Sequence, residues 1–132
     1  MHTLTFDHCH RYSDREVGIV LRVVLRLRDF EVELKARLDT GAENCIFARE
    51  YGEMLDLPIE EGSRLRFDTA AGHFDTYGHW ITVSACGTDV DCLAYFAHLP
   101  GFTHNVLGIH GWINKFQMGI DHDQCNLFLR QL

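Results

Sequence analysis

The residues best suited to chemistry are Asp39, Thr40 and Gly41, which directly follow an apolar leucine. An acid at the end of a strand would enter a tight turn, where a glycine lets backbone groups approach the carboxylate closely because it lacks a β-carbon. The threonine hydroxyl can hydrogen-bond within such a turn and fix its shape. The tripeptide therefore indicates a carboxylate held for catalysis, although the same three residues also suit an ordinary surface turn.

The context of this tripeptide favours catalysis. A second segment, Asn105-Val106-Leu107-Gly108, leads into an apolar stretch, and Thr69-Ala70-Ala71-Gly72 between the two reads as a hairpin tip. Their order and spacing resemble the retropepsin-like aspartic proteases, especially the small bacterial single-domain forms. In that family a strand ends in Asp-Thr-Gly-Ala, a hairpin flap closes over the substrate, and an apolar-apolar-Gly element passes behind the active-site turn into a helix. The resemblance covers residues 30 to 132.

The resemblance implies an aspartic endopeptidase that hydrolyses peptide bonds of a protein or peptide substrate. One motif supplies one carboxylate and the mechanism needs two, so a symmetric homodimer would place Asp39 beside Asp39 of its partner. Two carboxylates about 3 Å apart share a proton. The ionised carboxylate takes a proton from a water molecule, while the protonated one polarises the substrate carbonyl. No metal or other cofactor is implied.

Each motif receives a role from the resemblance. The catalytic turn would consist of Asp39, Thr40 and Gly41, with Thr40 bracing the paired turns across the dimer. The flap and substrate-binding residues would be Thr69, Ala70, Ala71 and Gly72, together with Ala42 beside the catalytic turn. Active-site support would come from Val106, Leu107 and Gly108, packed against that turn.

The sequence departs from the family pattern beside the downstream motif. Close relatives commonly carry arginine immediately before and after the Asn-Val-Leu-Gly element, whereas His104 and Ile109 occupy those places here. Apolar packing by Ile109 can replace an ion-pair network without loss of stability. The missing charges also favour an alternative, in which the fold is a catalytically inactive module for dimerisation or peptide binding.

The elements that must position these residues read mainly as short strands. Residues 30 to 38 alternate, with Val32, Leu34, Ala36 and Leu38 on one face, which is the period of a half-buried strand. Residues 17 to 27 form another apolar run, with arginines at alternate positions. Two hairpins are predicted, from residues 64–67 with 74–83 and from residues 82–86 with 90–96, and a last strand at 126–132.

Two stretches predict helices. Residues 48 to 57 contain helix formers and stop before Pro58, which disfavours helix in the residue preceding it. Residues 111 to 117 place Trp112, Ile113 and Phe116 on one helical face. The expected fold is therefore mainly β, a retropepsin-like closed β-barrel with one or two short helices.

The bulk composition excludes several classes of protein. The chain has 132 residues, without a linker or repeat, and residues 1 to 132 are expected to form a single domain. Its net charge is -7 and it has no long run of Lys or Arg, so binding to nucleic acid or to a membrane is not expected. The polar first ten residues lack the apolar core of a signal peptide, which favours a cytoplasmic location.

The five cysteines do not form a disulfide framework, and reduced thiols are expected. Cys86 and Cys92 flank a turn-like sequence and could pair across a hairpin. Cys45, near the acid, is expected to be a small core residue. His8 and His10 could chelate a metal from one strand face, but neither they nor the Asp121-His122-Asp123 segment has a known zinc spacing. Tyr77 and Trp80 could guard a substrate pocket or pack the base of the hairpin.

Overall fold

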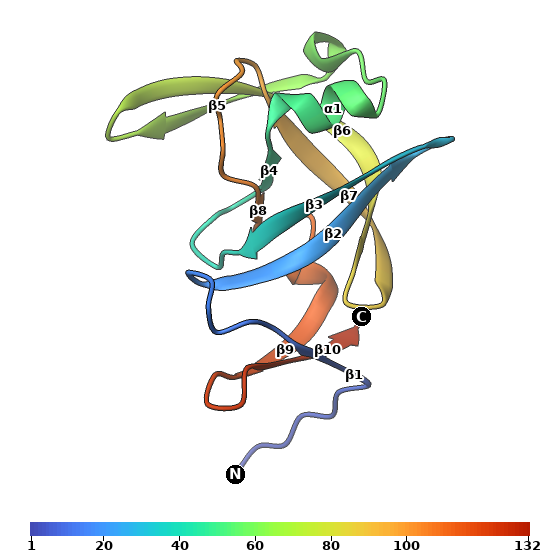
Figure 1. Ribbon diagram of the computed structural model, residues 1–132, viewed down its shortest axis with the longest axis vertical. Helices are drawn as coiled ribbons and strands as arrows, with labels where there is room; N and C mark the ends of the chain where they lie inside the picture. The colour runs from blue at the N-terminus through green and yellow to red at the C-terminus, as the bar shows by residue number, and fades with distance from the viewer.

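The computed structural model describes residues 1 to 132 and is built mainly from β-strands (Figure 1). The strands are β1 (His8–Arg11), β2 (Ile19–Leu27), β3 (Phe30–Leu38), β4 (Cys45–Phe47), β5 (Ser63–Thr69), β6 (Gly72–Ala85), β7 (Thr88–Ala97), β8 (Val106–Leu107), β9 (Phe116–Asp121) and β10 (Asn126–Gln131). The one α-helix is α1 (Arg49–Met54), and the two 3-10 helices are η1 (Ile59–Glu61) and η2 (Ile113–Lys115). The expectation of a mainly β fold is confirmed.

Six strands close into a barrel. Their order is β2-β3-β8-β4-β7-β6, and β6 returns to β2 through pairs from Val24↔Ser84 to Arg26↔Thr82. The short β8 pairs in parallel with β3 and antiparallel with β4, so it lies between them. The β5 strand pairs with the first half of β6 and forms a hairpin that projects beyond the barrel.

A second, three-stranded sheet has the order β1-β10-β9 and lies below the barrel in Figure 1. Its apolar side chains join the barrel interior, because Phe116, Leu127 and Leu129 belong to the same cluster of 23 buried residues as the barrel strands. Trp112 belongs to the same cluster and contacts Phe116, with ring centroids 4.7 Å apart. The two sheets therefore share one hydrophobic core.

Strand β3 has the bounds that its alternation predicts. Leu34, Ala36 and Leu38 are buried and Val32 is half-buried, whereas Glu33, Lys35 and Arg37 are exposed. The side-chain period of two places one apolar set inside the barrel and leaves the charged set in water. The strand thus leads from the core directly to Asp39.

Helix α1 is shorter than residues 48 to 57. Asp56 adopts φ 57°, a left-handed conformation that ends a helix, and the Leu57 N–H donates to the Gly52 carbonyl at 3.0 Å. The helix therefore ends at Met54, before the residues that precede Pro58. None of the helices is long and apolar enough to cross a membrane.

Three other predictions from the sequence are wrong in detail. Residues 111 to 117 form the short η2 and the start of β9 instead of one helix, because Phe116 is already extended at φ -134° and ψ 152°. The predicted strands 74–83 and 82–86 are one strand, β6, shared by both hairpins. Cys86 and Cys92 do not pair: all five cysteines are free, and Cys92 stands opposite Ile81 in the register.

Candidate active site

The candidate catalytic turn begins where β3 leaves the barrel. Asp39 continues the ladder for one residue, since its N–H donates to the Leu107 carbonyl at 3.0 Å. The chain then reverses, and the Ala42 N–H donates to the Asp39 carbonyl at 3.1 Å. Thr40 and Gly41 lie exposed in this turn, while Asp39 and Ala42 are half-buried.

The carboxylate of Asp39 is held by its own turn. The Gly41 N–H donates to Asp39 Oδ1 at 2.8 Å, and a β-carbon at Gly41 would stand 3.2 Å from the same oxygen. The other carboxylate oxygen, Oδ2, has no hydrogen-bond partner within the chain. One oxygen is therefore fixed by the backbone, and the other is free to face a water molecule, a substrate or another carboxyl group.

The downstream motif lies directly behind this turn. Leu107 is fully buried beside Leu38 in the parallel pairing of β8 with β3. Past the motif, the Ile109 N–H donates to the Ala42 carbonyl at 2.8 Å, and the His110 N–H donates to the Glu43 carbonyl at 2.7 Å. Main-chain hydrogen bonds therefore tie the segment just past the motif to the turn.

Gly108 lies where the downstream segment approaches the catalytic turn most closely. A β-carbon at this position would stand 2.6 Å from the Asn44 carbonyl carbon and 2.7 Å from the Ala42 oxygen, and closer still to the Asn44 oxygen. All three atoms belong to the backbone, so they cannot move aside like the end of a side chain. Only glycine fits where the chain passes behind the turn.

Two residues that the sequence did not assign to the site also tie it together. The Asn105 side-chain oxygen accepts from the Ala48 N–H at 2.9 Å, and its amide donates to the Lys35 carbonyl at 3.4 Å. Cys45 is fully buried, as expected, but its sulfur also accepts from the Gly108 N–H at 3.4 Å. The position of Asn105 immediately before Val106 was the available signal for its role.

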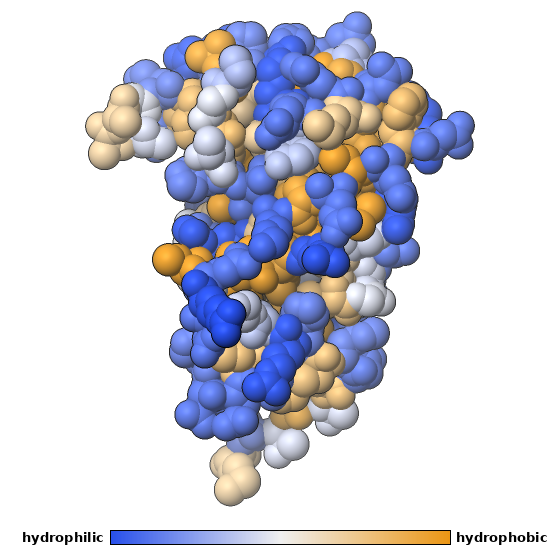
Figure 2. Space-filling view, in the orientation of Figure 1, coloured by the Kyte–Doolittle hydropathy of each residue, from blue (hydrophilic) through white to orange (hydrophobic).

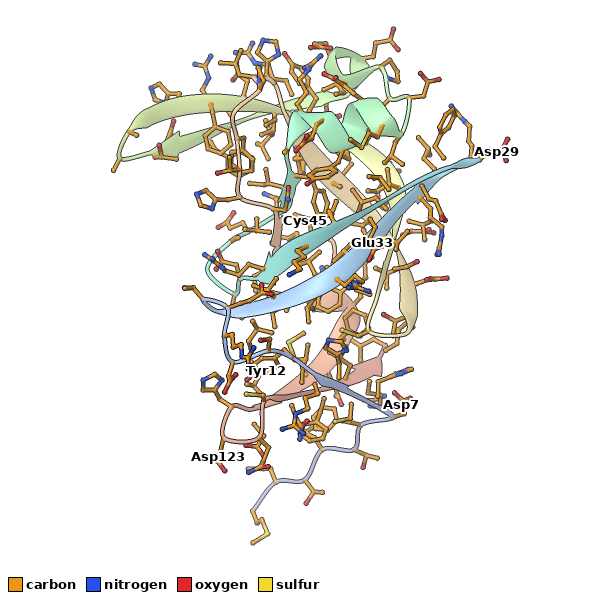
Figure 3. All side chains as sticks on the ribbon, viewed as in Figure 1. Asp7, Tyr12, Asp29, Glu33, Cys45 and Asp123 are labelled. Atoms are coloured by element: carbon orange, nitrogen blue, oxygen red, sulfur yellow. The ribbon has the colours of Figure 1, made fainter.

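Cys45, labelled in Figure 3, contacts a second buried thiol, that of Cys92. A hydrogen bond from Cys92 lowers the pKa of the Cys45 thiol. The same contact, together with burial, raises the pKa of Cys92. Burial alone raises the pKa of Cys86 to about 11. Both Cys45 and Cys92 have no exposed surface, and a thiol so enclosed packs as an apolar residue.

The predicted flap is the hairpin of β5 and β6. Thr69 pairs with Gly72, so Ala70 and Ala71 alone form the turn, and Gly72 has φ 123°. The Thr69 hydroxyl closes the tip by donating to the Gly72 carbonyl at 2.9 Å. In the view of Figure 1 this tip and the loop after β3 both project to the left, with the tip higher.

The two faces of this hairpin differ in chemistry. On one face Asp75 pairs with Arg66 at 3.1 Å and with Arg64 at 3.2 Å, and the Arg66 hydrogen bond, with both charges, holds the pKa of Asp75 below its ordinary value. On the other face Phe67 and Phe74 stack with centroids 5.3 Å apart. Phe74 also contacts Phe102 at 5.4 Å, beside a hollow of about 470 Å³.

The remaining candidates are not part of this arrangement. No group of three or more His, Cys, Asp or Glu side chains is placed to hold a metal ion. The His122 ring and the Tyr12 hydroxyl share a hydrogen bond of 2.7 Å. Tyr77 packs edge-on against His98, and Trp80 is 63% exposed on the outside of the barrel. For Tyr77 the contact supports the packing interpretation.

Comparison with solved structures shows the fold. A retropepsin-like aspartic protease from Rickettsia conorii aligns with a TM-score of 0.69 and 17% identity, over 98% of this chain and 96% of that one. EIAV protease complexed with the inhibitor HBY-793 aligns with a TM-score of 0.54 and 18% identity, over 73% of this chain and 86% of that one. No family model and no curated protein matches the chain. The chain therefore has the retropepsin-like fold that the motifs predicted.

Proposed function

We propose that this protein is an aspartic endopeptidase whose active site is built from two copies of Asp39 in a homodimer. The observation that carries the proposal is the state of the carboxylate: Oδ1 accepts from the Gly41 N–H at 2.8 Å, and Oδ2 has no partner in the chain. The fold shared with proteases from Rickettsia conorii and EIAV supports it. The chain would act on a protein or peptide, and its five free cysteines suit the reducing cytoplasm.

The need for a second copy follows from the chemistry. The catalytic turn of one chain supplies a single carboxylate, whereas water activation and carbonyl polarisation need two groups in opposite protonation states. A two-fold axis beside the exposed residues Thr40 and Gly41 would bring the two Asp39 side chains together. The pair would then titrate as one unit, and neither pKa would belong to one chain.

In this dimer the ionised carboxylate removes a proton from a water molecule held between the pair. The protonated carboxyl group donates to the carbonyl oxygen of the substrate, and the water adds to the carbonyl carbon. The resulting tetrahedral intermediate collapses when the leaving nitrogen takes the proton that was removed from water, the C–N bond breaks, and one hydroxyl of the intermediate returns its proton to the other carboxylate. The exposed flap tip, Thr69 to Gly72, would add backbone hydrogen bonds to an extended peptide and exclude water.

The departures at His104 and Ile109 do not remove the support for the turn. The Ile109 backbone N–H holds the Ala42 carbonyl at 2.8 Å, and its side chain is half-buried. The link between the two motifs therefore depends on main-chain hydrogen bonds, which need a backbone N–H at position 109 and no charged side chain. The absence of the flanking arginines therefore does not by itself argue for the alternative of an inactive dimerisation or peptide-binding module.

The proposal predicts inhibition by a peptide whose scissile amide is replaced by a tetrahedral hydroxyl-bearing carbon. Such a group imitates the intermediate, and transition-state analogues bind about 10²-fold or more tightly than substrates. The purified protein is incubated with an unfolded protein at mildly acidic pH, and fragments are followed by mass spectrometry with and without the inhibitor. Cleavage that the inhibitor does not suppress, or a dimer that binds peptides without cleaving them, would contradict the proposal.

A further inference from the structure

One cation stands unpaired beside the candidate catalytic turn. Arg37 is exposed two residues before Asp39, and its guanidinium group makes no hydrogen bond or ion pair with any side chain. Its neighbour on the same strand face, Lys35, is neutralised by Glu16 at 2.9 Å. Residues two apart on a strand point to the same side. Arg37 and Asp39 therefore project from the same face of the chain.

The side chain of Arg37 is directed along the strand toward Asp39. The register pairs Arg37 with Val20 and Leu38 with Ile19, so Gly18 lies one residue further on, across from Asp39. A β-carbon at Gly18 would stand 3.1 Å from Arg37 Cδ and 3.2 Å from Arg37 Nε. The arginine stem therefore packs against Gly18, so the side chain leans toward the end of the strand at which Asp39 lies.

A second polar group faces the same place. His104, the residue before Asn105, lines a hollow of about 130 Å³ together with Val20, Arg37 and Val106. His104 is exposed, and its ring meets Phe102 edge-on with centroids 6.3 Å apart. Val106 supplies an apolar wall, while Arg37 and His104 supply donors. Arginine is the side chain best suited to bind a carboxylate with two parallel hydrogen bonds.

We infer that Arg37, with His104, forms a subsite that selects an acidic side chain next to the scissile bond. This inference rests on the proposed function, and it names the class of substrate. Successive residues of an extended peptide are about 3.3 Å apart, so a residue adjacent to a carbonyl over Asp39 lies within reach of Arg37. A glutamate or aspartate there would neutralise the exposed guanidinium, and the surrounding hollow would exclude part of the solvent.

The hypothesis is tested with the purified protein and a tryptic peptide library prepared from a bacterial lysate. Mass spectrometry of the new termini gives the residues on both sides of each cleaved bond. Synthetic peptides that carry Glu or Gln at the enriched position are then compared by kcat/KM. We expect Glu to be preferred by about fivefold or more, the effect of one charge-assisted hydrogen bond. The Arg37→Gln variant should lose this preference.

Two further variants make the result specific. Arg37→Glu is expected to prefer Lys over Glu at the same position, a reversal that a folding defect cannot produce. Arg28→Gln is the matched control, because Arg28 also lacks an ion pair but lies at the opposite end of the β2–β3 hairpin. Wild-type cleavage without a preference for acidic residues would overturn the inference alone. Absence of any cleavage would overturn the proposed function and this inference with it.

Discussion

Replacing Asp39 with asparagine is expected to abolish peptide-bond cleavage while leaving the fold intact. An asparagine amide can neither ionise nor share a proton, so the pair can no longer activate water. We expect kcat/KM to fall by at least about a thousandfold, or roughly 4 kcal/mol of transition-state stabilisation. The amide oxygen can still accept the hydrogen bond that the Gly41 N–H now gives to Oδ1, so the turn keeps its shape.

The matched control is Asp29→Asn. Asp29 is exposed in the turn between β2 and β3, at the end of the hairpin far from the catalytic turn, and it is labelled in Figure 3. This variant should cleave the same peptide at the wild-type rate. Thermal unfolding of both variants checks that each is folded. Wild-type activity in a folded Asp39→Asn protein would contradict the proposed role of Asp39.

Replacing Gly108 with alanine is expected to cause the largest loss of stability. The new β-carbon would meet three backbone atoms, of Ala42 and Asn44, at 2.7 Å or less. Backbone segments on both sides are fixed by hydrogen bonds, so relief requires the catalytic turn and β8 to separate. We expect a loss of about 3 kcal/mol or more in the free energy of unfolding, measured by urea denaturation, with a parallel loss of cleavage.

The Gly101→Ala variant separates the cost of steric contacts made by a new β-carbon from the cost of placing alanine at a positive φ. Gly101 has φ 96°, which disfavours alanine, but a β-carbon there would meet no atom within 4 Å. Its replacement should cost about 1 kcal/mol, the conformational term alone. A Gly108→Ala protein as stable as the Gly101→Ala protein would contradict the close packing of Gly108 behind the turn.

Local patterns in the sequence predicted those parts of the structure that depend on neighbouring residues. The alternation in residues 30 to 38 is long and regular, and strand β3 has these bounds. The Thr69-Ala70-Ala71-Gly72 segment forms the predicted hairpin tip, because a two-residue turn followed by glycine suits tightly paired arms. The predicted position of Asp39, immediately after a half-buried strand, also agrees with the structure.

Features that depend on distant residues could not be predicted from these patterns. Strand β9 was missed although Phe116, Met118 and Ile120 alternate with Gln117, Gly119 and Asp121, because the residues leading into it, 111 to 117, were interpreted as a helix. The contact between Cys45 and Cys92 arises from the parallel pairing of β4 with β7. The direction of Arg37 follows from its register with β2, which places Gly18 diagonally across from it.

The charge pattern of the sequence does not distinguish Arg37 from the other charged residues of β2 and β3. Hydrophilic side chains cover most of the face in Figure 2, and hydrophobic ones gather in the band where β2 and β3 cross it. Most charged residues on these strands are paired, as Arg22 is with Glu33 at 2.9 Å and Arg26 with Glu31 at 3.1 Å. Only the ion pairs made in the folded structure show that Arg37, near Asp39, is left without a partner.

The central claim, that two copies of Asp39 form one site, is tested most directly by mixing chains. Wild-type protein is unfolded and refolded with an equal amount of Asp39→Asn protein, and cleavage is measured per wild-type chain. If subunits pair at random and mixed pairs are inactive, activity falls to about half, and to about one tenth with a ninefold excess of the variant. Refolding with the same mass of an unrelated protein should cause no loss. Undiminished activity per wild-type chain at every ratio would show that each chain works alone, and would contradict the claim.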